Sequence, residues 1–61
     1  MNSREIIKRL EQDGWTVARI NGSHHIMKHP SKPGSPSVPV HANRDLPKGL
    51  AHGILKEAGL K

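Results

Sequence analysis

The sequence gathers imidazole side chains around its centre, and imidazole is the side chain that gains or loses a proton most readily near neutral pH. The chain holds five histidines: His24, His25, His29, His41 and His52. His24 follows Asn21-Gly22, a dipeptide that is a strong signal for a two-residue hairpin turn. A histidine beside a hairpin turn is open to a substrate, so His24 is the first candidate for acid–base chemistry.

The predicted hairpin surrounds His24 with positive charge. A two-residue turn at Asn21-Gly22 places Arg19 directly opposite His24, with both side chains on one face. Lys28 projects from the same face four residues further on. A neighbouring cation disfavours the imidazolium, and a neutral imidazole beside phosphate-binding cations suits a general base that acts on a phosphodiester with an adjacent hydroxyl. RNA supplies that hydroxyl at its 2′ position.

Other residues near the turn and the second predicted helix are candidates for supporting roles. Gly22 is predicted to be a structural turn residue that supplies a positive φ, and Ser23 either caps the turn or binds a phosphate. Arg44 and Lys48 are further candidates for RNA contacts, because backbone N–H groups at the start of a helix also favour an anion. The second proton-transfer group is either His25 or a water molecule.

A histidine metal site is the main competing interpretation, and the sequence argues against it. The chain has no Cys and no HExxH motif, and Asp45 and Glu57 belong to a helix cap and a helix surface. His29 and His41 stand at strand ends, where imidazole commonly bonds the backbone, and His52 is predicted to face solvent on a helix. We therefore predict no metal ion and no other cofactor.

The distribution of charge points to a polyanionic partner. The 61 residues include 10 Lys and Arg against 5 Asp and Glu, which gives a formal net charge of +5. Residues 1–14 are balanced, so the excess lies in the rest of the chain, and no acidic residue occurs between Trp15 and Arg44. A basic region of this kind attracts nucleic acid first and an anionic lipid surface second.

The first half of the chain predicts a helix followed by a hairpin. Asn2 can cap a helix over residues 3–12, which the Asp13-Gly14 pair ends. Trp15–Ile20 and His24–His29 alternate in the manner of two paired strands. Trp15 is the only aromatic residue, and we assign it to the core because so small a domain needs its largest apolar side chain there.

The second half predicts a loop, a third strand and a second helix. Proline, glycine and serine in residues 30–36 favour a loop, and Pro39 confines the strand over residues 37–40 to a sheet edge. Pro47 suits the first turn of a helix that ends at Gly59, with Leu60 completing its cap. The predicted fold is α+β with the order αβββα, a three-stranded antiparallel sheet with two helices on one face.

Size and composition exclude several classes of protein. We predict one domain over residues 1–61, and a chain of this length has no room for a deep substrate cavity. The absence of Cys excludes disulfides, a thiolate nucleophile and a zinc ribbon. No run of residues suits a membrane span or a secretion signal, so we expect a cytoplasmic protein with no membrane partner.

Several ordered motifs resemble those of the HicA toxin family, over nearly the full length of the chain. They are Asp13-Gly14-Trp15, Gly22-Ser23-His24-His25, Lys28-His29-Pro30, Val38-Pro39 followed by His41, Asp45-Leu46-Pro47-Lys48-Gly49, and Ile54-Leu55-Lys56-Glu57-Ala58-Gly59-Leu60. The chain departs from the family pattern at Met27, where an aromatic residue is frequent, and at Leu50, where threonine is common.

The resemblance implies a specific function. HicA proteins are mRNA interferases, the toxins of type II toxin–antitoxin pairs, and they adopt a double-stranded-RNA-binding-domain-like fold. The histidine of the family's Gly-Ser-His motif corresponds to His24 and is the catalytic residue of a metal-independent endoribonuclease that stops translation. The implied partner is a HicB-type antitoxin that covers the His24 face, and contact with DNA is expected only indirectly, through the antitoxin.

The alternative interpretation is a non-catalytic RNA-binding module of the same fold. In that case the same cations would position an RNA backbone without cleaving it. A cleavage assay with a His24→Ala variant separates the two interpretations.

Overall fold

The structure is a computed structural model that describes residues 1–40 and 45–61. The predicted roles of His41 and Arg44 lie outside the described residues. The order of elements is the predicted αβββα: α1 (Ser3–Gln12), β1 (Thr16–Asn21), β2 (His24–Lys28), β3 (Ser37–Pro39) and α2 (Lys48–Glu57). Within the described ranges, neither helix is long and apolar enough to cross a membrane.

Helix α1 has the predicted bounds because its two ends are capped by side-chain and backbone hydrogen bonds. The Glu5 N–H donates to Asn2 Oδ1 at 2.9 Å, and the Asn2 N–H donates to the Glu5 carboxylate at 3.4 Å. At the other end, Gly14 has φ +102° and the Trp15 N–H donates to the Leu10 carbonyl at 3.0 Å. This cap turns the chain directly into the strand that follows.

Helix α2 starts one residue later than predicted and ends at Glu57, two residues before the predicted end at Gly59. Pro47 has an extended ψ of 143°, so it precedes the helix and Lys48 is the first helical residue. At the C-terminal end, Gly59 has φ +78° and the Leu60 N–H donates to the Leu55 carbonyl at 2.8 Å. The predicted glycine cap is therefore confirmed as a Schellman motif.

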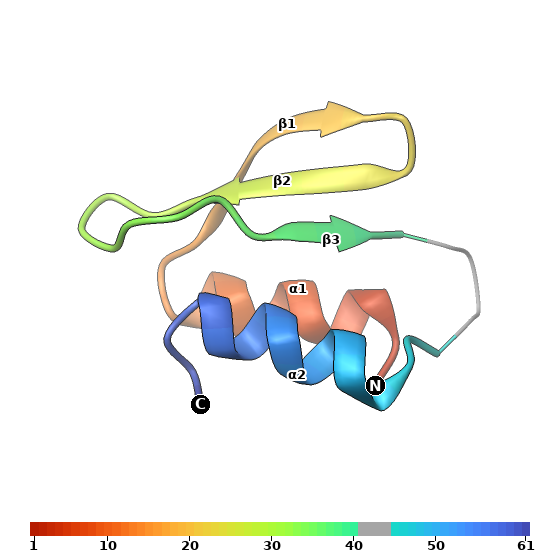
Figure 1. Cartoon of the computed structure of the whole chain (residues 1–61). Helices are drawn as coiled ribbons and strands as arrows, with labels where there is room; N and C mark the ends of the chain where they lie inside the picture. The colour runs from red at the N-terminus through yellow and green to blue at the C-terminus, as the bar shows by residue number, and fades with distance from the viewer. Residues whose placement is uncertain (41–44) are drawn as a thin grey trace.

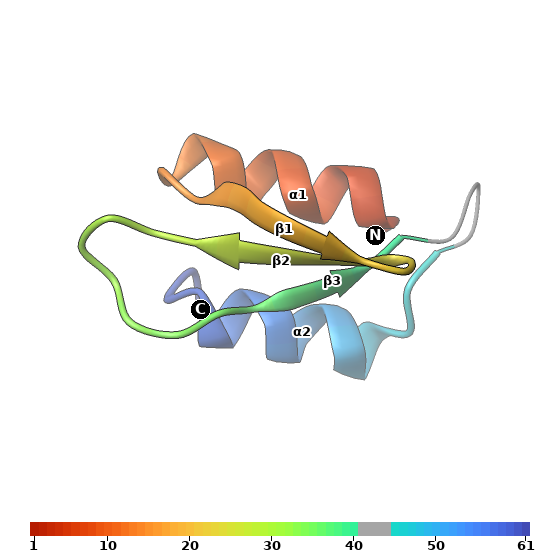
Figure 2. The ribbon, with the colours of Figure 1, turned by 90° about the horizontal axis from the view of Figure 1, so that it is seen from above.

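The three strands form an antiparallel sheet in the order β1-β2-β3. Figure 1 shows both helices on the same side of this sheet, with β3 nearest to them and β1 furthest away, and Figure 2 shows from above that the strands run between α1 and α2. Strand β3 lies at an edge, as Pro39 requires, because proline has no N–H to donate to a further strand.

The register of the hairpin differs from the prediction. Gly22-Ser23 forms the turn, Asn21 pairs with His24, and Arg19 pairs with Ile26. The prediction that Arg19 lies directly opposite His24 is therefore wrong. The partner of Arg19 moves by two residues, and an even shift leaves a side chain on the same face, so Arg19 still shares a face with His24.

The turn residues account for this register. Gly22 takes the first turn position with φ +62°, which suits a residue without a Cβ. The Ser23 carbonyl accepts a hydrogen bond from the Val40 N–H at 2.7 Å, so the residue just after β3 holds the turn. A turn at Asn21-Gly22 would move Ser23 out of the loop and into the strand.

A bulge in β1 explains how an irregular apolar pattern fits the sheet. Val17 and Ile20 are three residues apart, and a regular strand would place them on opposite faces. The register shifts at Ala18, so that Val17 pairs with Met27 and Ile20 pairs with His25. Both apolar side chains thereby lie on the same side of the sheet as the helices, although β1 extends past the helices and leaves 37% of Val17 and 60% of Ile20 exposed.

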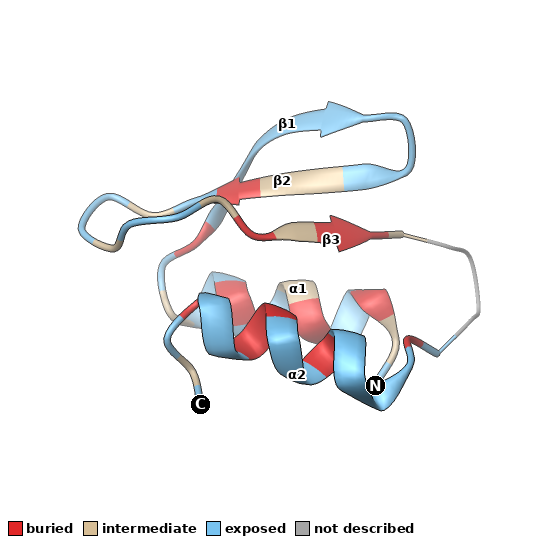
Figure 3. Cartoon of the chain, in the orientation of Figure 1, coloured by how far each residue is buried: buried red, intermediate tan, exposed pale blue. Residues whose placement is uncertain are grey.

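The core lies between the helices and the strands nearest to them. It consists of Ile6, Leu10, Trp15, Met27, Val38, Leu46, Ala51, Ile54, Leu55 and Ala58. The prediction that Trp15 belongs to the core is confirmed, since only 1% of its surface is exposed. Strand β1, in contrast, is exposed along its whole length (Figure 3), so the hairpin extends beyond the part of the sheet that the helices cover.

Candidate active site on the outer face of the sheet

Residues of β2 alternate between the two faces of the sheet, and this alternation defines the candidate site. Met27 is fully buried against the core, which assigns Met27 and His25 to the inner face. His24, Ile26 and Lys28 therefore lie on the opposite face, which we call the outer face. The departure of Met27 from the aromatic residue of the resembled pattern thus affects core packing and not the outer face.

His24 is exposed on the outer face and is held by one neighbour. Its Nδ1 lies 3.2 Å from Ser37 Oγ on β3, within hydrogen-bond distance. When Nδ1 carries the proton and donates it to Ser37, the lone pair of Nε2 is free to accept a proton from a substrate. Among the described residues, Nε2 makes no hydrogen bond that would compete with such a substrate.

Ser37 is the residue of this site that sequence reasoning missed. Its role depends on the register between β2 and β3, in which Ile26 pairs with Ser37 and His24 pairs with Pro39. The path of the loop over residues 29–36 sets that register. The sequence contained no signal for the Ser37–His24 contact, because loop residues rich in proline and glycine do not predict which strand pairs follow.

Arg19 and Lys28 share the outer face with His24, but neither is its direct partner. Arg19 lies beside Ile26, two pairs further from the turn than His24, and Lys28 pairs with Thr16 near the far end of the hairpin. The structure thus places two cations in a line that leads away from His24. The outer face carries no acidic side chain on β1, β2 or β3.

Ser23 and Lys48 take different positions relative to this face. Ser23 is an exposed turn residue directly before His24, and its hydroxyl makes no hydrogen bond to the described residues. Lys48 begins α2, where it lines a groove with Arg9 and Lys61 and with no strand residue. The structure therefore brings Ser23 to the candidate site and places Lys48 in the helix layer.

The other described histidines lie away from the outer face. His25 pairs with Val38 on the inner face, so its side chain lies on the opposite side of the sheet from His24. His52 is exposed on α2 and accepts a hydrogen bond at Nε2 from Lys61 Nζ at 2.7 Å. Within residues 1–40 and 45–61, no three His, Asp or Glu side chains come together in a way that could hold a metal ion.

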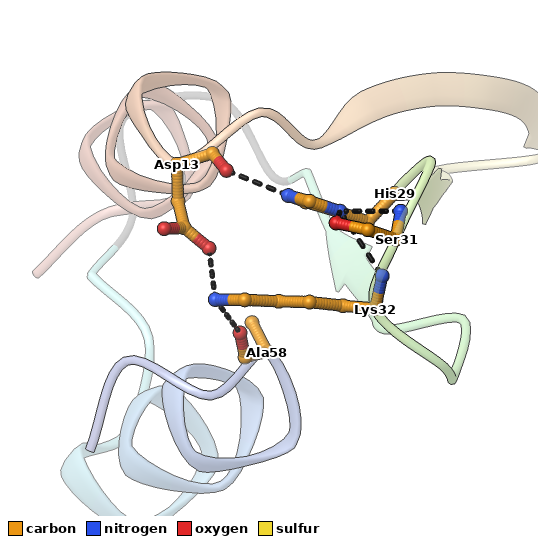
Figure 4. A network of polar contacts seen from close by, with 5 residues as sticks. All are labelled: Asp13, His29, Ser31, Lys32 and Ala58. Atoms are coloured by element: carbon orange, nitrogen blue, oxygen red, sulfur yellow. Dashed lines mark hydrogen bonds and ion pairs between the residues drawn. The ribbon is translucent and has the colours of Figure 1, made fainter.

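His29 has a structural role that the sequence analysis anticipated. Figure 4 shows its ring between two loops, with Nε2–H donating to the Asp13 carbonyl at 2.7 Å and Nδ1 accepting from the N–H groups of Ser31 and Lys32. The Lys32 ammonium donates to the Asp13 carboxylate and to the Ala58 carbonyl. This charged hydrogen bond holds the pKa of Asp13 below its usual range.

A comparison with known protein families gives a match over nearly the whole chain. A family model described as the HicA toxin of bacterial toxin–antitoxin matches residues 3–60, which is nearly the whole chain. A comparison with curated protein sequences finds no match.

Proposed function

The chain belongs to the HicA toxin family and is the toxin of a toxin–antitoxin system, and from this premise we propose that it is a metal-independent endoribonuclease that cleaves mRNA and so inhibits translation. The observation that carries the proposal is the exposed His24 imidazole, held through Nδ1 by Ser37 on a sheet whose three described strands carry no acidic side chain. A single fixed imidazole on an open, basic surface suits a reaction that needs one proton acceptor and an anionic substrate.

In the proposed reaction, Nε2 of neutral His24 removes the proton from a ribose 2′-hydroxyl. The O2′ atom then forms a bond to the adjacent phosphorus, and the bond from phosphorus to the bridging 5′ oxygen breaks. The departing 5′ oxygen takes a proton from water, since His25 faces the other way. The products are a 2′,3′-cyclic phosphate and a 5′-hydroxyl.

The cations of the outer face would hold the RNA backbone. Arg19 and Lys28 lie along the hairpin from His24 and are our candidates for phosphate contacts, and the free hydroxyl of Ser23 is a candidate on the other side of His24. The hairpin turn and the start of α2 lie at the same end of the molecule (Figure 1). Lys48 would therefore contact an RNA only if that RNA continues past this end of the sheet. One acid–base group contributes about 10²- to 10⁴-fold, so we expect a slow enzyme.

As a toxin, the chain has an antitoxin as its partner. We propose that this partner is of the HicB type and that it acts by covering the outer face. A protein seated there blocks His24, and carboxylates on it would pair with Arg19 and Lys28. Any contact of the pair with DNA would come through the antitoxin.

The reaction type is tested with a defined single-stranded RNA that has one cleavage site. The purified chain is assayed in excess chelator on this RNA and on the same RNA with a 2′-deoxynucleotide at the cut. We expect cleavage of the first RNA only, with a 2′,3′-cyclic phosphate at the new end. Cleavage of the deoxy-substituted RNA, or dependence on a metal ion, would overturn the proposal, and binding without cleavage would leave a non-catalytic RNA-binding module.

A further inference from the structure

The outer face is hollowed on the side of the hairpin that leads away from His24. The hollow has a volume of about 350 Å³ and is lined by Ala18, Arg19, Ile26, Lys28 and Ser35. Strand β1 supplies Ala18, at its bulge, and Arg19. Strand β2 supplies Ile26 and Lys28, and the loop after β2 supplies Ser35. Three separate segments therefore build this hollow, and the loop is fixed alongside β2 because the Met27 N–H donates to the Pro36 carbonyl at 2.9 Å.

The lining combines apolar and cationic groups in a way that matches one nucleotide. Ala18 and Ile26 present methyl and methylene groups on which the face of a base can pack. Arg19 and Lys28 supply positive charge for a phosphate, and the hydroxyl of Ser35 can bond a ribose or base edge. The volume lies at the lower end of the range for small-ligand sites, which fits a single nucleotide and not a duplex.

The position of the hollow relates it to the proposed cleavage site. Ile26 and His24 lie on the same face of β2 two residues apart, so the hollow begins about 7 Å from His24 along the strand. A nucleotide in the hollow would thus be a close neighbour of the one that is cut. Its base has to leave any stacked or paired arrangement to pack against Ala18 and Ile26, because both of its faces are covered within a duplex.

We propose that this hollow is a subsite for one unpaired nucleotide adjacent to the cleaved phosphate, and that the toxin therefore acts on single-stranded stretches of RNA. The proposal rests on the proposed ribonuclease function. It adds a role for the β1 bulge, which keeps the small Ala18 side chain at the wall of the hollow.

The subsite is tested with variants that fill the hollow from two different segments. Ala18→Ile and Ser35→Ile each add an apolar side chain to the lining, and Ser31→Ile is the matched control on the same loop outside the hollow. Because the Ser31 hydroxyl lies 3.3 Å from Nδ1 of His29, all variants are assayed at a temperature at which their unfolding curves show them fully folded. The substrates are a short single-stranded RNA with one cut, two versions with an abasic ribose on either side of the cut, and a duplex over the cut. The measurement is kcat/KM for each pair of protein and RNA.

We expect that one abasic RNA is cleaved by the wild type roughly tenfold more slowly, as is typical when a protein loses its contact with one base. Ala18→Ile and Ser35→Ile should lose a similar factor on the intact RNA and no further factor on that abasic RNA, because both changes remove the same contact. Ser31→Ile should match the wild type, and the duplex should resist cleavage. Equal rates of the filled variants and the wild type on intact RNA, or rapid cleavage of the duplex, would overturn the subsite.

A binding measurement tests the nucleotide subsite independently of the proposed ribonuclease activity. Fluorescence anisotropy of the intact and abasic RNAs is recorded with wild type, Ala18→Ile and Ser31→Ile. If the wild type cleaves nothing, the ribonuclease proposal fails, and a weaker affinity of Ala18→Ile for intact RNA alone still supports a nucleotide site in the hollow. Equal affinities of all three proteins for both RNAs would contradict it.

Discussion

Substitution of His29 by alanine should destabilise the fold, whereas the same substitution of His24 should leave its stability unchanged. The His29 ring bridges the end of α1 and the loop after β2, with Nε2–H donating to the Asp13 carbonyl and Nδ1 accepting from two backbone N–H groups (Figure 4). It also meets the Trp15 ring edge to face, with ring centroids 5.2 Å apart and an interplanar angle of 65°. His29→Ala removes all of these contacts together.

The expected loss of stability follows from these contacts. Each hydrogen bond contributes about 0.5–1.5 kcal/mol, and an edge-to-face aromatic pair contributes about 0.5–1.5 kcal/mol beyond its buried area. The three hydrogen bonds plus the contact with Trp15 give a loss of about 2–6 kcal/mol in the free energy of unfolding. A domain of this size has roughly 3–5 kcal/mol in total, so His29→Ala should be partly unfolded at room temperature.

The assay is urea denaturation followed by the fluorescence of Trp15, which is the only tryptophan and is buried. His24→Ala is the control, because His24 is exposed and bonds only Ser37 among the described residues, and its unfolding midpoint should stay close to that of the wild type. If His29→Ala unfolds at the same urea concentration as the wild type, the bridging role assigned to this ring is refuted.

Two further predictions concern glycines and the pH dependence of folding. Gly14→Ala should destabilise the fold, because φ is +102° and an added Cβ would lie 2.8 Å from Nε2 of His29. Gly53→Ala should stabilise the fold by about 0.4–1 kcal/mol, because an added Cβ meets open space within α2. Thermal unfolding of both variants checks these opposite signs. The Asp13 pKa is lowered by Lys32, so this contact stabilises the fold above the usual carboxyl pKa of 3.8 and is lost as pH falls through the lower folded value. The free energy of unfolding of wild type and Asp13→Asn should therefore differ most above pH 3.8, and the difference should shrink as the pH falls through the folded pKa of Asp13. A difference that does not change with pH would contradict the assignment.

The sequence was informative where local rules decide the structure. The capping residue Asn2 and the glycines after both helices specified where the helices begin and end, and the proline in the third strand specified an edge. The start of α2 was one residue off, because Pro47 is compatible both with the first turn and with the position before it.

The site was harder to predict because it depends on strand register. A two-residue turn could form at Asn21-Gly22 or at Gly22-Ser23. The first turn places Arg19 opposite His24, and the second, which the structure adopts, places Asn21 there. The bulge at Ala18 and the contact of Ser37 with His24 follow from pairings across the sheet, which no single segment encodes. The shared face of His24 and Lys28 was predictable from alternation along β2, and Arg19 shares it because the predicted and observed registers differ by an even number of residues.

The central claim, that the His24 imidazole performs the proton transfer, is tested most directly by substituting two adjacent histidines. His24 and His25 are neighbours in β2 on opposite faces of the sheet, so His25→Ala is a matched control for His24→Ala. Single-turnover cleavage of one defined RNA is measured in excess chelator for both variants and the wild type, after their unfolding midpoints have been compared. We predict that His24→Ala cleaves about 10²- to 10⁴-fold more slowly than the wild type while His25→Ala stays within a few-fold. Cleavage by a folded His24→Ala at the wild-type rate would contradict the account.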